Sequence, residues 1–119
     1  LTSLSLVILA ARAYGHAVVD GITSDFKNMH SFEYACRLGR DMGFDGKTLI
    51  HPAQIEIANA AFAPSAAELE LAARQIAAFA EAQAAGQGVA VVDGKIVENL
   101  HIMMAEALLA KASAIAAMA

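Results

Sequence analysis

Two strand-like segments of this sequence end in polar residues of types that can bind a ligand or take part in catalysis. Asp20 follows the apolar run 17–19, and His51 follows the apolar pair 49–50. In a parallel α/β sheet or barrel, ligands gather at the carboxyl ends of the strands. A carboxylate there would face the substrate, and an imidazole can donate a hydrogen bond to a ligand carbonyl or phosphate. The sequence therefore predicts that Asp20 and His51 line a small-molecule site at the strand ends.

Each of these residues also has a structural interpretation that the sequence leaves open. Asp20 and Gly21 are of the types that commonly make the turn out of a strand. His51 can be a structural histidine that hydrogen-bonds a loop. Pro52 and Gln54 fit a role in shaping the following turn better than a role in reaction.

Glu98 is a further candidate, because a glutamate can act as a general base. The alternative is a solvated residue near a helix start, where the helix dipole favours an acidic side chain. His30 and His101 have no carboxylate or cysteine at metal-ligand spacing, so we expect no metal site. Cys36 lies on an apolar stripe without a nearby histidine to activate it, and we expect it to pack as a small hydrophobic residue.

The elements that must position the strand-end residues form a β-α-β unit. The sequence predicts a helix over residues 3–14 that ends at Gly15, and then a buried strand over 16–22. A helix over 31–42 leads to a second strand over 47–50. Short connections around a crossover helix imply parallel strands with a right-handed turn. The apolar stripe of the crossover helix comprises Phe32, Ala35, Cys36, Gly39 and Met42.

The second half of the chain carries strong local signals. A short helix over 54–62 precedes a capping box, in which Ser65 and Glu68 cap each other's backbone amides at the start of a longer helix. Asp93-Gly94 between two apolar runs is the strongest short hairpin signal. A last helix is predicted over 99–118. The longer helix ends near residue 86, and its predicted buried seam comprises Leu69, Ala72, Ile76, Phe79 and Gln83.

The segment Gly46-Lys47-Thr48 is not a phosphate-binding P-loop. That motif requires a glycine five positions before Gly46, and residue 41 is aspartate. Moreover, Lys47 opens a strand here, whereas the lysine of a P-loop opens a helix.

The composition restricts the class of protein. The chain has 119 residues, 58% of them hydrophobic, and a net charge of -4, which argues against disorder and against nucleic acid as a partner. One cysteine excludes an intrachain disulfide and fits the cytoplasm. The apolar run 4–11 is too short to span a membrane and predicts a buried helix, so we expect no membrane partner. Because the chain begins at Leu1 without an initiator methionine, we expect the natural start to lie elsewhere.

Four segments in order resemble the citrate lyase beta-subunit-like branch of the HpcH/HpaI aldolase superfamily. The specific one is Gly43-Phe44-Asp45-Gly46-Lys47 through Ile50-His51-Pro52-x-Gln54, which is similar to the last barrel strand of these acyl-CoA lyases. The others are Val18-Val19-Asp20-Gly21 with Asp25-Phe26, Phe62-x-Pro64-Ser65 with Glu68, and Asp93-Gly94-Lys95-Ile96-Val97.

The resemblance implies an α/β fold in which residues 1–62 form the last two β/α units of a TIM barrel. Residues 63–119 would then be a helical extension or lid with a β-hairpin. It implies a magnesium-dependent carbon-carbon lyase that acts on 3-hydroxyacyl-CoA thioesters such as malyl-CoA or citryl-CoA, with an oxo acid as the other small molecule. The magnesium ligands of the family would fall before Leu1, so the chain alone would be inactive.

The resemblance also implies roles for individual residues. Asp20, Gly21, His51 and Pro52 would lie near the bound acyl-CoA. Glu98 matches an aspartate that in many relatives reaches into a neighbouring subunit's active site. Either Glu98 would keep the role of base, with a side chain one methylene longer, or it would no longer have that role. Such a lid requires a homo-oligomer, and the family commonly forms trimers.

Two alternatives to the lyase remain. An acyl-CoA thioesterase on the same scaffold would yield free CoA, whereas a lyase yields an oxo acid or aldehyde plus acyl-CoA. In the other alternative, the alanine-rich helices near 66–85 and 99–118 form a noncatalytic association module.

Overall fold

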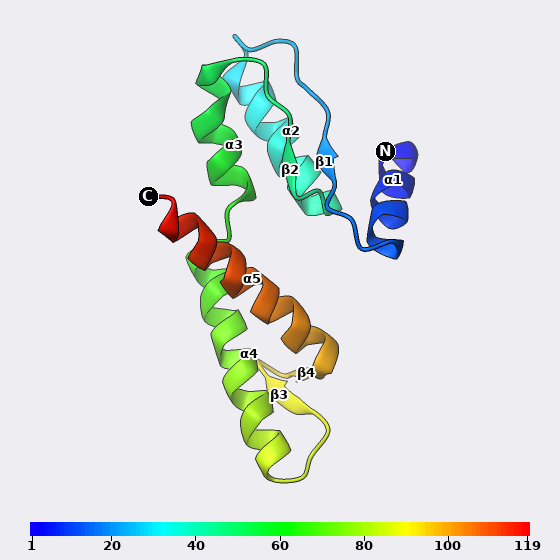
Figure 1. Ribbon diagram of the computed structural model, residues 1–119, viewed down its shortest axis with the longest axis vertical. Helices are drawn as coiled ribbons and strands as arrows, with labels where there is room; N and C mark the ends of the chain where they lie inside the picture. Colours follow the sequence, from blue (N-terminus) through cyan, green and yellow to red (C-terminus); the bar gives the residue numbers. More distant parts are fainter. The chain divides into compact units, whose positions relative to one another are not determined.

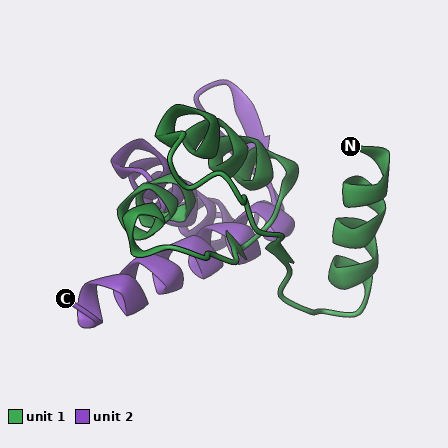
Figure 2. Cartoon of the chain, turned by 90° about the horizontal axis from the view of Figure 1, so that it is seen from above, with its two compact units in different colours: residues 1–63 green, residues 64–119 purple.

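The computed structural model describes all 119 residues and divides them into two compact units, Leu1–Ala63 and Pro64–Ala119 (Figure 2). The boundary predicted from the sequence, between residues 62 and 63, lies one residue before this division. Each unit has a buried apolar cluster of its own.

The first unit contains a short parallel β-ladder flanked by helices (Figure 1). In register, Val19 lies opposite Gly46 and Asp20 lies opposite Lys47. This confirms the predicted β-α-β unit with parallel strands. The elements are α1 Thr2–Ala13, β1 Val19–Asp20, α2 Met29–Met42, β2 Gly46–Lys47, the 3-10 helix η1 Pro52–Gln54 and α3 Ile55–Phe62.

The strands are shorter and more exposed than the sequence predicts. β1 covers two residues of the predicted 16–22, and β2 ends at Lys47 rather than Ile50. The prediction of buried strands was wrong, because Val19 is 55% exposed and Ile50 is 49% exposed. The reason is that a parallel sheet buries its strands only where further strands and helices cover both faces.

Helix α1 was also predicted to be buried, and this was wrong. Ile8 is its one buried residue, whereas Leu6 and Leu9 are more than 60% exposed. Its predicted end is confirmed by a Schellman motif at Gly15, whose φ is +70°. There the amide of His16 donates to the carbonyl of Ala11 over 2.8 Å.

Helix α2 forms the centre of the first unit. Asn28 caps its start by accepting from the amide of Ser31, and Gly43 ends it with a φ of +111°. The predicted apolar stripe is confirmed, because Phe32 and Cys36 are fully buried and Gly39 is buried with them. The cluster they join also contains Ile8, Phe44, Ala58 and Phe62.

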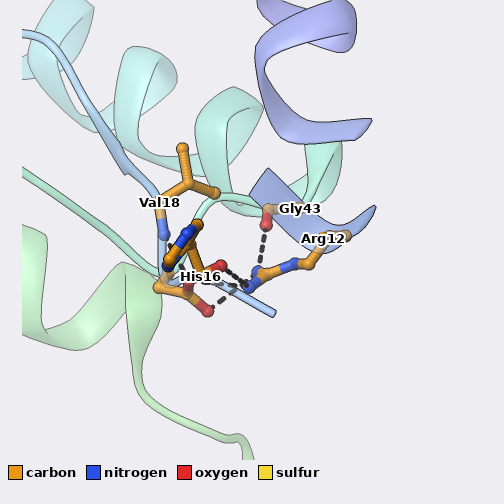
Figure 3. Close-up of polar contacts among 5 residues, drawn as sticks. Arg12, His16, Val18 and Gly43 are labelled. Atoms are coloured by element: carbon orange, nitrogen blue, oxygen red, sulfur yellow. Dashed lines mark hydrogen bonds and ion pairs between the residues drawn. The ribbon is translucent and has the colours of Figure 1, made fainter. Parts of the chain in front are cut away.

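A polar cluster ties α1 to the amino ends of both strands, and we call it the amino-end clasp. Arg12 binds both carboxylate oxygens of Asp45, at 2.9 and 3.0 Å, and donates to the carbonyl of Gly43 over 2.8 Å. Figure 3 shows the Arg12 side chain reaching Gly43 and His16. Asp45 also accepts from the amide of Val18, so one carboxylate joins the segments that enter β1 and β2.

The second unit is a helix, a β-hairpin and a helix. Its elements are α4 Ala66–Ala84, β3 Ala90–Val92, β4 Lys95–Val97 and α5 Asn99–Ala117. The predicted capping box at Ser65 and Glu68 is present. The predicted hairpin is also present, with positive φ at both Asp93 and Gly94, as a type I′ turn requires.

The core of the second unit lies between α4, α5 and the hairpin. Phe79, Val97 and Ile102 are buried in it. The predicted seam of α4 was wrong at Gln83, which is exposed, while the neighbouring Ala82 is buried. The small apolar side chain of Ala82 suits close packing, whereas the Gln83 amide keeps its solvent hydrogen bonds.

Helix α5 is long and apolar enough to cross a membrane by length and composition, with a mean hydropathy of 1.4. One such helix is weak support for a membrane protein, and Ile102 and Ala105 of this helix are buried. The prediction that the protein has no membrane partner stays a prediction.

Candidate functional site

Four of the predicted site residues lie at the carboxyl end of the β1–β2 ladder. Asp20 ends β1 and Gly21 follows it, while His51 and Pro52 follow the extended segment after β2. The parallel pairing that brings the two strand ends to one edge is the reason these residues share a region. Their contact with substrate remains a prediction.

Asp20 is held by a buried lysine. The Lys47 ammonium donates to Oδ2 of Asp20 over 3.3 Å and to the carbonyl of Gly21 over 2.7 Å. The other carboxylate oxygen of Asp20 accepts from the amide of Gly21 over 2.8 Å. The carboxylate therefore fixes the turn out of β1, which is the structural interpretation that the sequence left open.

Helix α2 leaves room for this carboxylate at Gly39. A Cβ added to Gly39 would lie 3.1 Å from Oδ2 of Asp20 and 3.6 Å from Cζ of Phe62. Glycine inside a helix costs roughly 0.5–1 kcal/mol relative to alanine. Glycine is nevertheless suited to this position, because a larger residue would displace Asp20.

His51 has one ring nitrogen committed to the backbone. Its Nδ1 accepts from the amide of Ala53 over 3.1 Å and so caps η1. The neutral ring then carries its proton on Nε2, which is a donor with no partner among the hydrogen bonds of the protein. The ring also stacks on Phe26, with centroids 4.4 Å apart and planes 5° apart. The ring of His51 is thus held by the Ala53 amide and by Phe26, and no protein group uses its Nε2–H.

Gln54 is the fully buried polar residue beside this site. Its side-chain oxygen accepts from the amide of Ile50, and its nitrogen donates to the carbonyl of Thr23, both over 3.1 Å. Pro52 occupies the first turn of η1, where its missing amide hydrogen costs nothing. Both residues shape the segment, as the sequence predicts.

Sequence reasoning missed three residues at this end of the ladder, namely Phe26, Gly39 and Lys47. The signal for Lys47 was a charged residue at the start of a predicted apolar strand. The signals for Phe26 and Gly39 were weaker, because nothing in the sequence says which side chain a loop phenylalanine or a helical glycine will contact.

Glu98 belongs to the second unit and is exposed. It is the N-cap residue of α5, and its amide donates to Nδ1 of His101 over 3.1 Å. The helix-start position expected for a solvated glutamate is therefore present. The Glu98 side chain in turn caps the helix start in a capping box with His101, and its role as a base remains a prediction.

Cys36 lies in the core of the first unit and is fully buried. Desolvation raises the pKa of its thiol, against the opposing effect of the nearby Lys47 ammonium. The thiol therefore stays neutral at physiological pH, consistent with the predicted role as a small hydrophobic residue.

The residues described do not fit a magnesium ion. No three His, Cys, Asp or Glu side chains lie together in an arrangement that could hold a metal. Asp20, the acidic residue at the strand ends, is instead paired with Lys47.

An open cavity of about 560 Å³ lies between α2 and α3, apart from the predicted site residues. Its walls carry charges of both signs, from Glu33, Arg37, Arg40, Asp41 and Glu56.

No protein-family model matches the chain. The chain is 68% identical over 114 residues to a (3S)-malyl-CoA thioesterase from Cereibacter sphaeroides, a match that covers 96% of this chain and 40% of the relative. It is 34% identical over 114 residues to citrate lyase subunit beta from Leuconostoc mesenteroides, covering 96% of this chain and 38% of the relative. The chain is similar to part of the citrate lyase beta-like proteins.

A solved structure agrees with this similarity. The chain matches protein CitE from Mycobacterium tuberculosis, in complex with magnesium, acetoacetate and coenzyme A, with a TM-score of 0.74 and 29% identity. The match covers 92% of this chain and 40% of that chain. The predicted α/β fold class is confirmed, and the matched part is the carboxyl-terminal one. The closed TIM barrel remains a prediction, because the first unit contributes two strands.

Proposed function

We propose that the full-length protein carrying this sequence is an acyl-CoA thioesterase that hydrolyses malyl-CoA or a similar 3-hydroxyacyl-CoA. The observation that carries the proposal is the 68% identity to a malyl-CoA thioesterase, twice the 34% identity to a citrate lyase subunit. In this reaction water adds to the thioester carbonyl, the carbon-sulfur bond breaks, and malate and the thiol of CoA leave. The sequence alone favoured the lyase over this alternative.

The geometry of His51 supports a role in binding the acyl-CoA. Its Nε2–H can donate to the thioester carbonyl or to a phosphate of CoA, while the Ala53 amide and the Phe26 ring fix its orientation. A preorganised donor of this kind binds an oxygen of the ligand without first losing side-chain freedom. Gly21 and Pro52 would line this end of the site through van der Waals contacts.

A carbon-carbon lyase is the second candidate, supported by the similarity to citrate lyase subunit beta. It would split malyl-CoA into glyoxylate and acetyl-CoA by breaking the bond between C2 and C3 of the malyl group. In either reaction, Glu98 is the residue we propose as the base, because it is an exposed carboxylate at the start of α5. We further propose that magnesium is bound by residues other than those described, and that the enzyme is a cytoplasmic homo-oligomer.

A product-resolved assay tests the proposal. The full-length protein is incubated with malyl-CoA and Mg²⁺, and free thiol, malate, glyoxylate and acetyl-CoA are each measured. Equal amounts of free CoA and malate support the thioesterase, whereas glyoxylate and acetyl-CoA in equal amounts support the lyase. Absence of all four products contradicts both.

The role of Glu98 is tested in the same assay. Glu98→Gln removes the basic carboxylate and should lower kcat at least about 100-fold. Glu106→Gln on the exposed face of the same helix is the matched control and should leave turnover unchanged. Unchanged turnover of Glu98→Gln would remove this residue from the mechanism.

A further inference from the structure

The ammonium of Lys47 is buried at the edge of the molecule where ligands are expected. Its side chain is 4% exposed and that of its partner Asp20 is 18% exposed. A buried ion pair rarely stabilises a fold more than well-packed apolar residues would. Stability of the fold therefore does not explain why this ammonium is buried.

Its two bonds fix the peptide that leaves β1. Lys47 holds the carbonyl of Gly21, and Asp20 holds the amide of the same residue, so both polar groups of Gly21 are occupied. The carbonyl of Asp20 accepts from the amide and the hydroxyl of Thr48. The direction in which the chain leaves β1 is thus set from β2, while Gly39 leaves the slot that the Asp20 carboxylate fills.

The segment fixed in this way reaches His51. Further along, the carbonyl of Thr23 is bound by Gln54, and Phe26 stacks on the His51 ring. The segment Gly21–Phe26 is therefore attached to the region around β2 at three places, and its last contact sets the imidazole plane. A substitution of Lys47 would therefore alter the orientation of the His51 imidazole through this segment.

We propose that Lys47 is a positioning residue, which holds the segment Gly21–Phe26 and thereby orients His51 toward the acyl-CoA. This inference rests on the proposed function for the identity of the ligand. It assigns to Lys47 no contact with substrate.

The first test is the variant Lys47→Met, which keeps the length of the side chain but removes the ammonium. The loss of two polar contacts should raise hydrogen exchange of the Gly21 and Phe26 amides, which donate to Asp20 and Ser24, about tenfold or more. The KM for malyl-CoA should rise by about the same factor in the full-length protein, with kcat within roughly threefold of the unaltered protein. The matched control is Lys95→Met, an exposed lysine of β4, which should change neither measurement.

Two further variants separate positioning from folding. Gly39→Ala places a methyl group 3.1 Å from Oδ2 of Asp20 without changing any charge, and should loosen the same segment by a smaller factor. The double variant Asp20→Asn/Lys47→Met leaves no unpaired charge, so it should fold even where Lys47→Met does not, with the segment still mobile.

Hydrogen exchange and KM within twofold of the unaltered protein, in Lys47→Met or in the double variant, would overturn the proposal. A role confined to stability would lower the melting temperature without changing KM, and this result would overturn it too. If the unaltered protein turns over no acyl-CoA, the proposed function fails, and the exchange measurement still decides whether Lys47 positions the segment.

Discussion

Each end of the β1–β2 ladder carries an ion pair, but the pair at the amino end is partly exposed and the pair at the carboxyl end is mostly buried. At the amino end, Arg12 and Asp45 are 46% and 40% exposed, and they bind one another and the backbone. At the carboxyl end, Lys47 is buried, and His51 keeps a donor that no protein group uses. A bidentate ion pair that also binds the backbone can stabilise the strands, and a held imidazole with an unused donor can bind a ligand.

In α/β barrels in general, one end of the strands supports the fold and the other holds the active site, and we expect the same division here. The order of the residues along the chain produces this difference. Asp45 lies before β2 and Asp20 lies at the end of β1, so parallel pairing sends the two carboxylates to opposite ends. We expect substitutions at the amino end to affect stability and those at the carboxyl end to affect turnover.

The largest effect is expected from His51→Asn. Asparagine can still accept from the Ala53 amide, but it lacks the ring and the Nε2–H of His51. Loss of a preorganised donor should lower kcat/KM for malyl-CoA about 100-fold in the full-length protein. His16→Ala, which alters an exposed imidazole at the amino end, is the control and should leave kcat/KM unchanged. If His51→Asn keeps a kcat/KM near that of the unaltered protein, the carboxyl end does not act on malyl-CoA through His51.

The second prediction concerns the amino-end clasp. Asp45→Ala leaves Arg12 without its bidentate partner and the Val18 amide without its acceptor. Because the pair is partly exposed, we expect a loss of about 1–2 kcal/mol in the free energy of unfolding, measured by urea denaturation. Asp41→Ala on the same unit is the control. A fall in kcat/KM without a fall in stability would show that the two ends are not separate in function.

The third prediction uses Cys36, which is packed beneath the ladder. Because burial raises the pKa of its thiol, Cys36 should react with iodoacetamide at pH 8 at least about 100-fold more slowly than an unfolded cysteine. The thiolate would become more available only as the pH rises toward the raised pKa. Rapid alkylation of the native protein, followed by mass spectrometry of the peptide, would show that this core opens readily.

The smallest effect is expected from the exposed pair of Arg74 and Asp93 in the second unit. Arg74 lowers the pKa of Asp93 through a bidentate hydrogen bond and its charge. The stabilisation is present above the unfolded pKa of about 3.8 and is lost as the pH falls through the lower folded value. Asp93→Asn should therefore lower the melting temperature slightly at pH 7 and have no effect at the acidic limit. The same shift at both pH values would assign it to the turn backbone instead.

The features predicted correctly from the sequence were those that local chemistry determines. The capping box at Ser65, the Asp93-Gly94 turn and the end of α1 at Gly15 each depend on a few neighbouring residues. The stripe of α2 was predictable because its period is that of a helix. The exposure of α1 and of the strands was not, because it depends on which elements cover them.

The candidate site was predictable in its location but not in its internal contacts. Parallel pairing placed Asp20 and His51 at one edge, as expected from the two strand ends. The partner of Asp20, the ring that stacks on His51 and the need for glycine at residue 39 depend on three-dimensional proximity. The reaction type was also beyond the residue pattern, since lyase and thioesterase were both compatible with it.

The central claim is that the carboxyl end of the ladder, and not the amino end, binds an acyl-CoA. Histidines occur at both ends, so NMR of the full-length protein with ¹⁵N-labelled histidine can compare them directly, with signals assigned through His51→Asn and His16→Ala. On titration with malyl-CoA, the ring signals of His51 should shift saturably and those of His16 should stay in place. A shift at His16 with none at His51 would contradict the account.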